Sequence, residues 1–157
     1  MSNSIQVIKD IASFIGTRPS ETGGLLLAKK GQGAEEVSYF LPDEGAQVTG
    51  VTYTPSTHWV EECLAVPGVE LRGFVHSHPQ GYPQPSDGDF EFVGRWFDAN
   101  PQLKVFHLPI IEAPPLPRWV LEGVNNPQGW NHAAAILAVR ERIRWYVITK
   151  NDRIYLL

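Results

Sequence analysis

Residues 79–85, PQGYPQP, contain three prolines and sharply limit what the surrounding chain can form. Proline fixes φ and lacks the backbone donor that a sheet needs, so this segment is predicted to be a loop. The residues before it, ELRGFVHS, have the apolar and β-branched character of a strand, whereas a helical pattern begins at Ser86. The chain is therefore expected to pass from a strand through a stiff loop into a helix.

Apolar periodicity and turn residues predict the remaining elements. Helices are expected at residues 4–15, within 56–68 with Ser56 as a cap, from Ser86 to Asn100 with Phe90, Val93, Trp96 and Phe97 facing inward, and at 131–143. Strands are expected at 23–28, 35–40, 47–54, 70–77, 103–111 and 118–124, followed by a hairpin of 145–149 and 153–157. Strict alternation of strands and helices is missing, which favours an α+β fold.

The length of 157 residues, 43% of them hydrophobic, predicts one domain over residues 1–157. The net charge of −4, without a basic cluster, argues against nucleic acid or an anionic membrane as a partner. No apolar run approaches the roughly 18 residues of a membrane span, and the N-terminus does not resemble a signal peptide. A cytoplasmic location is the expectation, and the single Cys63 excludes an internal disulfide.

His76 and His78 stand at the end of the strand that precedes the proline loop. Alternate residues of a strand point to the same face, so the two imidazoles can converge on one point. Asp89 falls in the first turn of the next helix and can supply a third ligand if the loop folds back. Two imidazoles and one carboxylate leave a tetrahedral zinc ion with an open fourth position, as catalytic zinc sites require.

Other interpretations of these residues remain open at this point. Ser86 and Asp89 also form the S-x-x-D pattern of an ordinary helix N-cap. A histidine at a strand end is commonly a satisfied polar residue rather than a ligand. Two histidines and a carboxylate are also the facial triad of non-haem iron oxygenases.

The string His76-Ser-His78-Pro, followed after six residues by Ser86-x-x-Asp89, resembles the metal-binding signature of the JAMM (MPN-plus) metalloprotease family. Glu21, just before the apolar segment GGLLL, is similar to an upstream glutamate of that family. The resemblance covers about residues 4–110 and is to the compact prokaryotic members. It implies an MPN/JAB-like fold, in which helices flank a curved mixed β-sheet.

The resemblance also implies a role for each signature residue. His76, His78 and Asp89 would bind one catalytic zinc ion per chain, and Glu21 would act as general base and later as general acid. The Ser86 hydroxyl would lie near the oxyanion that develops on the scissile carbonyl. These roles are chemically sound, because a positioned carboxylate can transfer protons and a hydroxyl donor can stabilise developing negative charge.

Members of this family commonly hydrolyse the bond after the C-terminal glycines of ubiquitin or a ubiquitin-like protein. The resemblance therefore implies a zinc-dependent isopeptidase or peptidase that acts on a ubiquitin-like protein or its conjugate, for deconjugation or precursor maturation. Some compact prokaryotic members serve antiphage conjugation systems, and others act in sulfur-carrier pathways or on phage tails. The alternatives are a non-catalytic binding scaffold, since many relatives have lost the metal ligands, and a peptidase of sulfur-carrier or phage-tail substrates.

A glycine-ended tail can bind by adding a strand to an exposed sheet edge. Residues 47–54 or the segment before LRGFVHSH are expected to offer that edge. Gly23 and Gly24 are expected to allow a close backbone approach beside the metal. Outside the signature, Cys63 is expected in the core, Trp130 in an exposed loop, and His58, His107 and His132 in structural or exposed positions.

Overall fold

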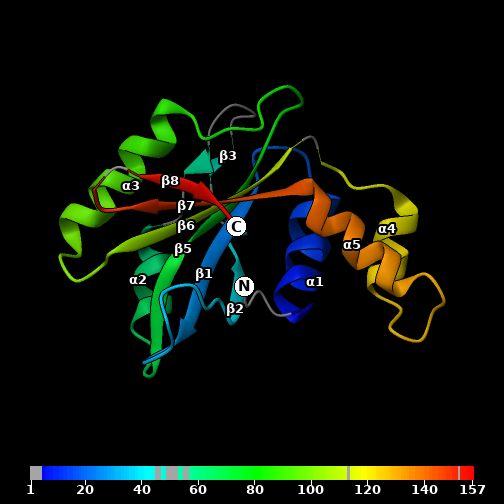
Figure 1. Cartoon of the computed structure of the whole chain (residues 1–157), viewed down its shortest axis with the longest axis horizontal. Coiled ribbons are helices and arrows are strands. Elements are labelled where there is room, and N and C mark those ends of the chain that lie inside the picture. The colour runs from blue at the N-terminus through cyan, green and yellow to red at the C-terminus, as the bar shows by residue number, and fades with distance from the viewer. Residues whose placement is uncertain (1–4, 45–46, 49–52, 55–56, 113, 152) are drawn as a thin grey trace.

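The computed structural model describes residues 5–44, 47–48, 53–54, 57–112, 114–151 and 153–157 (Figure 1). Its helices are α1 (Ile5–Phe14), the 3-10 helix η1 (Ile15–Thr17), α2 (Thr57–Leu64), α3 (Asp87–Ala99), α4 (Arg118–Val124) and α5 (His132–Arg142). Its strands are β1 (Gly23–Lys29), β2 (Tyr39–Pro42), β3 (Gln47–Val48), β4 (Tyr53–Thr54), β5 (Val69–His78), β6 (Val105–Glu112), β7 (Ile143–Thr149) and β8 (Ile154–Leu156). Across these residues, no helix combines the length and apolar character needed to cross a membrane.

A mixed six-stranded sheet forms the centre of the protein, in the order β2-β1-β5-β6-β7-β8. The neighbours β5 and β6 are parallel, and the other neighbouring pairs are antiparallel. Parallel neighbours need a crossover connection, which here includes α3. This mixed sheet with flanking helices confirms the predicted α+β class.

Alternate residues of the central strands face two hydrophobic cores on opposite sides of the sheet. On β5, Val75 packs with residues of α1, α4 and α5, whereas Phe74 packs with residues of α2 and α3. On β1, Leu26 belongs to the first core and Leu25 to the second. Figure 1 shows the same division of the helices between the two sides. Because helices cover both faces, consecutive residues such as Leu25 and Leu26 or Phe74 and Val75 are all apolar.

Several predicted elements are confirmed. The expected helices in 4–15, 56–68, 86–100 and 131–143 correspond to α1, α2, α3 and α5, and the C-terminal hairpin is β7 with β8. Ser4 and Ser56, the predicted first residues of two helices, lie outside the described residues. Ser86 is the N-cap of α3, as its sequence pattern indicated.

The prediction of a strand at 118–124 is wrong, because this segment is the helix α4. Its β-branched and aromatic residues favoured a strand, but burial repeats at helical spacing at Val120 and Val124. Gly123 lies so close to Ala135 of α5 that a Cβ there would be 2.7 Å from the alanine methyl. Close helix packing therefore outweighs the local propensity.

Two strand boundaries also differ from the prediction. The segment 47–54 is not one strand: Gln47 pairs with Thr54 in a separate two-stranded sheet of β3 and β4. The strand predicted at 35–40 is β2, which begins only at Tyr39. Carbonyl groups of residues 32–36 instead accept hydrogen bonds from the side chains of Arg72 and His107.

The predicted inward face of α3 is partly wrong. Val93 and Phe97 are buried and Trp96 packs against the same core, as expected. Phe90 instead keeps 37% of its surface exposed. The first turn of α3 therefore lies at the margin of the core, where it also carries Asp89.

Candidate metal centre

His76 and His78 lie at the C-terminal end of β5, on the sheet face that carries Phe74 and is covered by α3. Both side chains are buried, and their Nε2 atoms are 2.8 Å apart. The predicted convergence of the two imidazoles is therefore present in the structure.

Asp89 reaches both histidines from the first turn of α3. Its Oδ1 atom is 3.1 Å from Nε2 of His76, and its Oδ2 atom is 3.2 Å from Nε2 of His78. Donor atoms bound to tetrahedral zinc at roughly 2.0–2.1 Å stand about 3.3 Å from one another. The three side chains thus match the donor types and nearly the spacing that a zinc ion requires.

The N-cap of α3 fixes the Asp89 carboxylate. The backbone N–H of Ser86 donates to Oδ2 of Asp89 at 2.8 Å, and the backbone N–H of Asp89 donates to the Ser86 hydroxyl at 3.1 Å. The cap and ligand interpretations of this pattern are therefore compatible. The capping box holds the carboxylate toward the histidines as an outer hydrogen-bonded shell holds a metal ligand.

The ring orientation of His78 is set by the loop that follows it. Nδ1 of His78 lies 2.9 Å from the carbonyl oxygen of Tyr82. A carbonyl oxygen can only accept, so Nδ1 carries the proton and donates. Nε2, the atom that faces His76 and Asp89, therefore donates to Asp89 only in the doubly protonated ring and offers a lone pair in the neutral ring.

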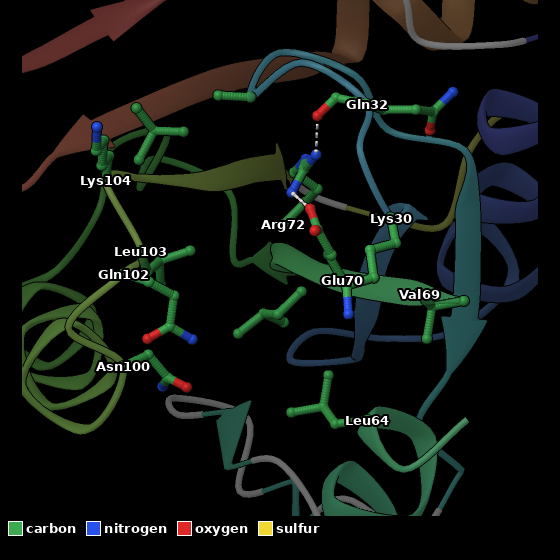
Figure 2. Close-up of a pocket in the computed structure, with 13 residues that line it drawn as sticks. Lys30, Gln32, Leu64, Val69, Glu70, Arg72, Asn100, Gln102, Leu103 and Lys104 are labelled. Carbon is green, nitrogen blue, oxygen red and sulfur yellow. Dashed lines mark hydrogen bonds and ion pairs between the residues drawn. The ribbon is translucent and has the colours of Figure 1, made fainter. Parts of the chain in front are cut away.

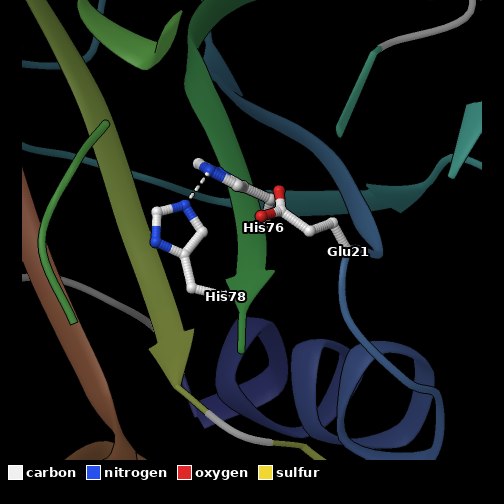
Figure 3. Close-up of side chains that lie close together, drawn as sticks. All are labelled: Glu21, His76 and His78. Atoms are coloured by element: carbon white, nitrogen blue, oxygen red, sulfur yellow. Dashed lines mark hydrogen bonds between the residues drawn. The ribbon is translucent and has the colours of Figure 1, made fainter. Parts of the chain in front are cut away.

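Glu21 lies two residues before β1, the strand that borders β5, and approaches the histidines from there. Gly23 pairs with His76, and the backbone N–H of Ser77 continues this pairing by donating to the Thr22 carbonyl at 2.9 Å. Glu21 is 4% exposed, and its carboxylate has an oxygen within 4.8 Å of the ligand atoms of both histidines. Figure 3 shows this carboxylate beside the ring of His76. Glu21 is thus not an ordinary solvated loop residue.

Two carboxylates, Glu21 and Asp89, are therefore candidates for the third metal ligand. Glu21, His76 and His78 form a buried group that could hold a metal ion. Asp89, however, lies within 3.2 Å of both Nε2 atoms through its two oxygens. These direct contacts to both imidazoles favour Asp89 as ligand, with Glu21 beside the metal position. Both assignments stay predictions.

The pKa values of the two carboxyl groups, Glu21 and Asp89, are shifted in opposite directions. Burial raises the pKa of the Glu21 carboxyl, and the nearby His76 and His78 only partly offset this effect. Burial acts in the same direction on Asp89, but hydrogen bonds from His76 and His78 outweigh it and hold the pKa of Asp89 well below its usual range. Asp89 thus remains ionised, as a metal ligand should. The raised pKa of Glu21 brings its proton affinity closer to that of a general base.

A cleft of about 710 Å³ opens beside this centre. Glu21, His78 and Ser86 line it together with the proline loop between β5 and α3. Tyr82 in this loop is 66% exposed. The structure therefore places the predicted base, one predicted metal ligand and the predicted hydroxyl donor on one accessible cleft.

A second cleft, of about 630 Å³, lies at the opposite end of β5 (Figure 2). Lys30, Lys104 and the apolar side chains of Leu64 and Leu103 contribute to its lining. Arg72 also lines it, and the guanidinium donates to backbone carbonyls of Gln32, Gly33 and Glu36 while pairing with Glu70. Arg72 thus ties the β1–β2 connection to β5 and has a structural role.

Predictions outside the signature have mixed outcomes. Cys63 is buried in the core and Trp130 is exposed, both as expected. Gly24 permits a close approach to Phe40 and to the Leu41 carbonyl of β2, and Gly23 pairs with His76, so the close approach beside the metal stays a prediction. His107 and His132 bond to backbone carbonyls, which confirms structural roles, and the side chain of His58 lies outside the described residues.

Three residues outside the signature also support the centre and were not predicted from the sequence. Tyr82 acts through its carbonyl, and Glu112 and Tyr146 bond to the main chain of the same loop. Backbone contacts leave no sequence motif. The strand register that sets His78 beside Glu112 also becomes visible only in the folded sheet.

A mixed sheet with helices on both faces, and two histidines with two carboxylates at one strand end, define an α+β domain with a candidate metal centre. The family described as prokaryotic homologs of the JAB domain matches residues 14–122, and the chain belongs to this family. The resemblance seen in the sequence is thereby confirmed.

Two solved structures are similar to this chain. A protein from Desulfitobacterium hafniense is 16% identical, with a TM-score of 0.53 over 97% of this chain and 86% of that chain. A JAB1/MPN domain protein from Archaeoglobus fulgidus is 15% identical, with a TM-score of 0.49 over 99% of this chain and 94% of that chain. No curated protein matches the sequence significantly.

Proposed function

We propose that the protein is a zinc-dependent isopeptidase or peptidase that cleaves after the C-terminal glycines of a ubiquitin-like protein. The observation that carries this proposal is the convergence of His76, His78 and Asp89 within 3.2 Å, beside the buried Glu21 and at an open cleft. Membership of the JAB family supports a metallohydrolase, and the substrate class follows from the family resemblance.

His76, His78 and Asp89 would hold the zinc ion. When bound, zinc lowers the pKa of a coordinated water toward neutrality and polarises a carbonyl oxygen. The capping box keeps the Asp89 carboxylate toward the histidines, and the Tyr82 carbonyl keeps Nε2 of His78 available. Each of these contacts exists within the chain itself, so the centre is preorganised.

Glu21 would take a proton from the attacking water and pass it to the leaving amine. Its burial raises the carboxyl pKa, which brings the group nearer to the proton affinity that both transfers need. Positioned proton transfer of this kind typically contributes about 10²–10⁴-fold to a rate. The role requires Glu21 to stay beside the ligands without being one of them.

Ser86 would donate a hydrogen bond to the oxyanion that forms on the scissile carbonyl. Its hydroxyl oxygen already accepts from the Asp89 backbone, so the hydroxyl hydrogen is left to donate elsewhere. Ser86 also lines the cleft beside the metal position. Preorganised donors of this kind stabilise developing charge without reorganisation during the reaction.

An extended glycine tail suits such a cleft, because residues without side chains pass close to the metal without steric conflict. Of the two segments expected to offer a pairing edge, the one before LRGFVHSH leads into β5, between β1 and β6. The β3–β4 pair stands outside the main sheet and remains the candidate edge. A tail bound there would gain main-chain hydrogen bonds.

The test begins with the metal content of the purified protein and of a His76→Ala variant, measured by elemental mass spectrometry. The proposal expects about one zinc per chain in the wild type and loss of zinc in the variant. Iron in place of zinc would support an oxygenase, and no metal after zinc addition would support a non-catalytic scaffold.

Cleavage is then measured with ubiquitin-like proteins that carry a C-terminal extension or an isopeptide-linked lysine after the terminal glycines. A substrate whose terminal glycines are replaced by alanine is the matched control. Zinc-dependent cleavage of the glycine substrate alone supports the proposal. A zinc-loaded protein that cleaves neither modifier class would direct attention to sulfur-carrier or phage-tail substrates.

A further inference from the structure

The proline loop between β5 and α3 is held by two side chains that belong to other strands. The backbone N–H of Gly81 donates to Oε2 of Glu112 at 2.6 Å, and the Tyr146 hydroxyl donates to the Pro83 carbonyl at 3.2 Å. Between these two attachment points lies Tyr82, whose carbonyl accepts from Nδ1 of His78 at 2.9 Å. The carbonyl that orients His78 is thus restrained on both sides.

We propose that Glu112 and Tyr146 are positioning residues that set the metal affinity of the centre through the Tyr82 carbonyl and His78. The inference rests on the proposed metal-dependent function. Neither residue belongs to the predicted site, and each acts on the imidazole only through the loop.

Glu112 is placed for this role by the parallel pairing of β5 and β6. In that pairing its Cα is the register partner of His78, the last residue of β5. Gly81 has φ +90°, a left-handed conformation that glycine adopts without strain, and its N–H meets the carboxylate of Glu112. A hydrogen bond to an ionised carboxylate is roughly twice as strong as a neutral one, so this attachment is firm.

Tyr146 supplies the second attachment from β7. Its ring is buried in the core shared with α2 and α3, which leaves the residue 8% exposed. The hydroxyl at the end of this fixed ring reaches the Pro83 carbonyl. Pro83 has a restricted φ, so fixing its carbonyl also limits the peptide unit that it shares with Tyr82.

The consequence concerns the tautomer of His78. A carbonyl held at Nδ1 selects the ring form with the proton on Nδ1 and the lone pair on Nε2. If the carbonyl moved away, the proton could shift to Nε2, and the ring could rotate away from His76 and Asp89. Outer partners of ligating histidines typically change metal affinity by about 10–100-fold.

Four single variants test the inference. Glu112→Ala removes the acceptor for Gly81, whereas Glu112→Gln keeps an acceptor oxygen without the charge. Tyr146→Phe removes one hydroxyl and leaves the buried ring. Glu141→Ala, on the exposed surface of α5, removes a carboxylate elsewhere and is the matched control.

Two readouts are measured on each variant. The first is the imidazole ¹⁵N chemical shift of His78 in metal-free protein, at a pH above its titration, which reports the tautomer. The second is the zinc dissociation constant, from competition with a chelator. We expect Glu112→Ala and Tyr146→Phe to raise the Nε2-protonated fraction and to weaken zinc binding by about 10-fold or more. Glu112→Gln should change both less than Glu112→Ala, and Glu141→Ala should change neither.

Wild-type tautomer populations and wild-type zinc affinity in Glu112→Ala and Tyr146→Phe would overturn the inference, even if their melting temperatures fell. If Glu112→Ala does not fold, Glu112→Gln and Tyr146→Phe still decide, since both preserve the packing. A wild-type protein that binds no zinc would instead refute the proposed function. The tautomer measurement needs no metal, so it would then still test whether Glu112 and Tyr146 position the ring of His78.

Discussion

Ser86 and Asp89 each donate a backbone N–H to the side chain of the other, at 2.8 and 3.1 Å. The residue that begins α3 and the carboxylate that faces the two histidines are therefore one hydrogen-bonded unit. Any change at the helix start is transmitted to the candidate metal centre. An experiment therefore has to separate an effect on helix stability from an effect on the metal site.

Replacing Ser86 by alanine should lower stability and activity but leave zinc bound. Loss of a serine N-cap costs about 1 kcal/mol, whereas Asp89 keeps its contacts with both histidines. Loss of an oxyanion donor is expected to reduce kcat by about 10²–10³-fold. Urea unfolding, metal analysis and steady-state kinetics measure the three effects, with Ser86→Thr as the conservative control. Full activity in Ser86→Ala would make the hydroxyl purely structural.

Replacing Glu21 by glutamine should retain zinc and strongly reduce turnover. The amide keeps the shape of the buried side chain but cannot accept a proton, so the rate should fall by about 10²–10⁴-fold. Metal content and single-turnover cleavage are measured on the same preparation. Loss of zinc in this variant would make Glu21 a ligand, and a normal rate would remove it from the chemistry.

Replacing Asp89 by asparagine should remove zinc and activity together. The amide oxygen can still accept from the Ser86 N–H, so the helix cap is largely kept while the ligand charge is lost. Asp87→Asn is the matched control, because Asp87 also lies in the first turn of α3 but is exposed. Zinc retained at wild-type affinity in Asp89→Asn would move the ligand role to Glu21.

His107 should make folding stability depend on pH. Burial lowers the pKa of its imidazole, although its hydrogen bond to the Ala34 carbonyl opposes this shift. Below a pH of about 6.5, the unfolded chain takes up a proton at this histidine that the folded protein resists. Stability should therefore fall as pH drops from about 6.5 toward the lower pKa of the folded state.

This dependence is measured by urea unfolding of metal-free protein between about pH 5 and 7. The contribution of one histidine is at most about 1.4 kcal/mol per pH unit, and it should disappear in His107→Gln. The glutamine amide can replace the donor to Ala34. If the free energy of unfolding depends on pH in the same way in the wild type and in His107→Gln, then His107 does not resist protonation in the folded protein.

Much of the candidate centre was predictable because its residues are close in sequence. The one-residue spacing of His76 and His78 fixes a shared strand face, and the S-x-x-D pattern fixes the start of a helix. The position of Glu21 was foreseeable only from the family resemblance, because it depends on the register in which Gly23 meets His76.

The errors in the fold have a common physical origin. Residues 118–124 carry side chains that suit a strand, but their contact with α5 stabilises a helix instead. The strand predicted at 35–40 starts late, because Arg72, distant in sequence, takes the Glu36 carbonyl as an acceptor, and His107 holds the preceding residue Ala34. Tertiary contacts override local propensity in both places.

The position of β5 inside the sheet has a consequence for how the protein opens. Strands β1 and β6 border β5, so amide hydrogens at Val75 and His76 should exchange with solvent only by global unfolding. Asp89 lies in a helical first turn, where fraying requires far less free energy. The slow step in losing a bound ion should therefore be governed by local opening of α3, while the histidine pair remains assembled and ready to rebind.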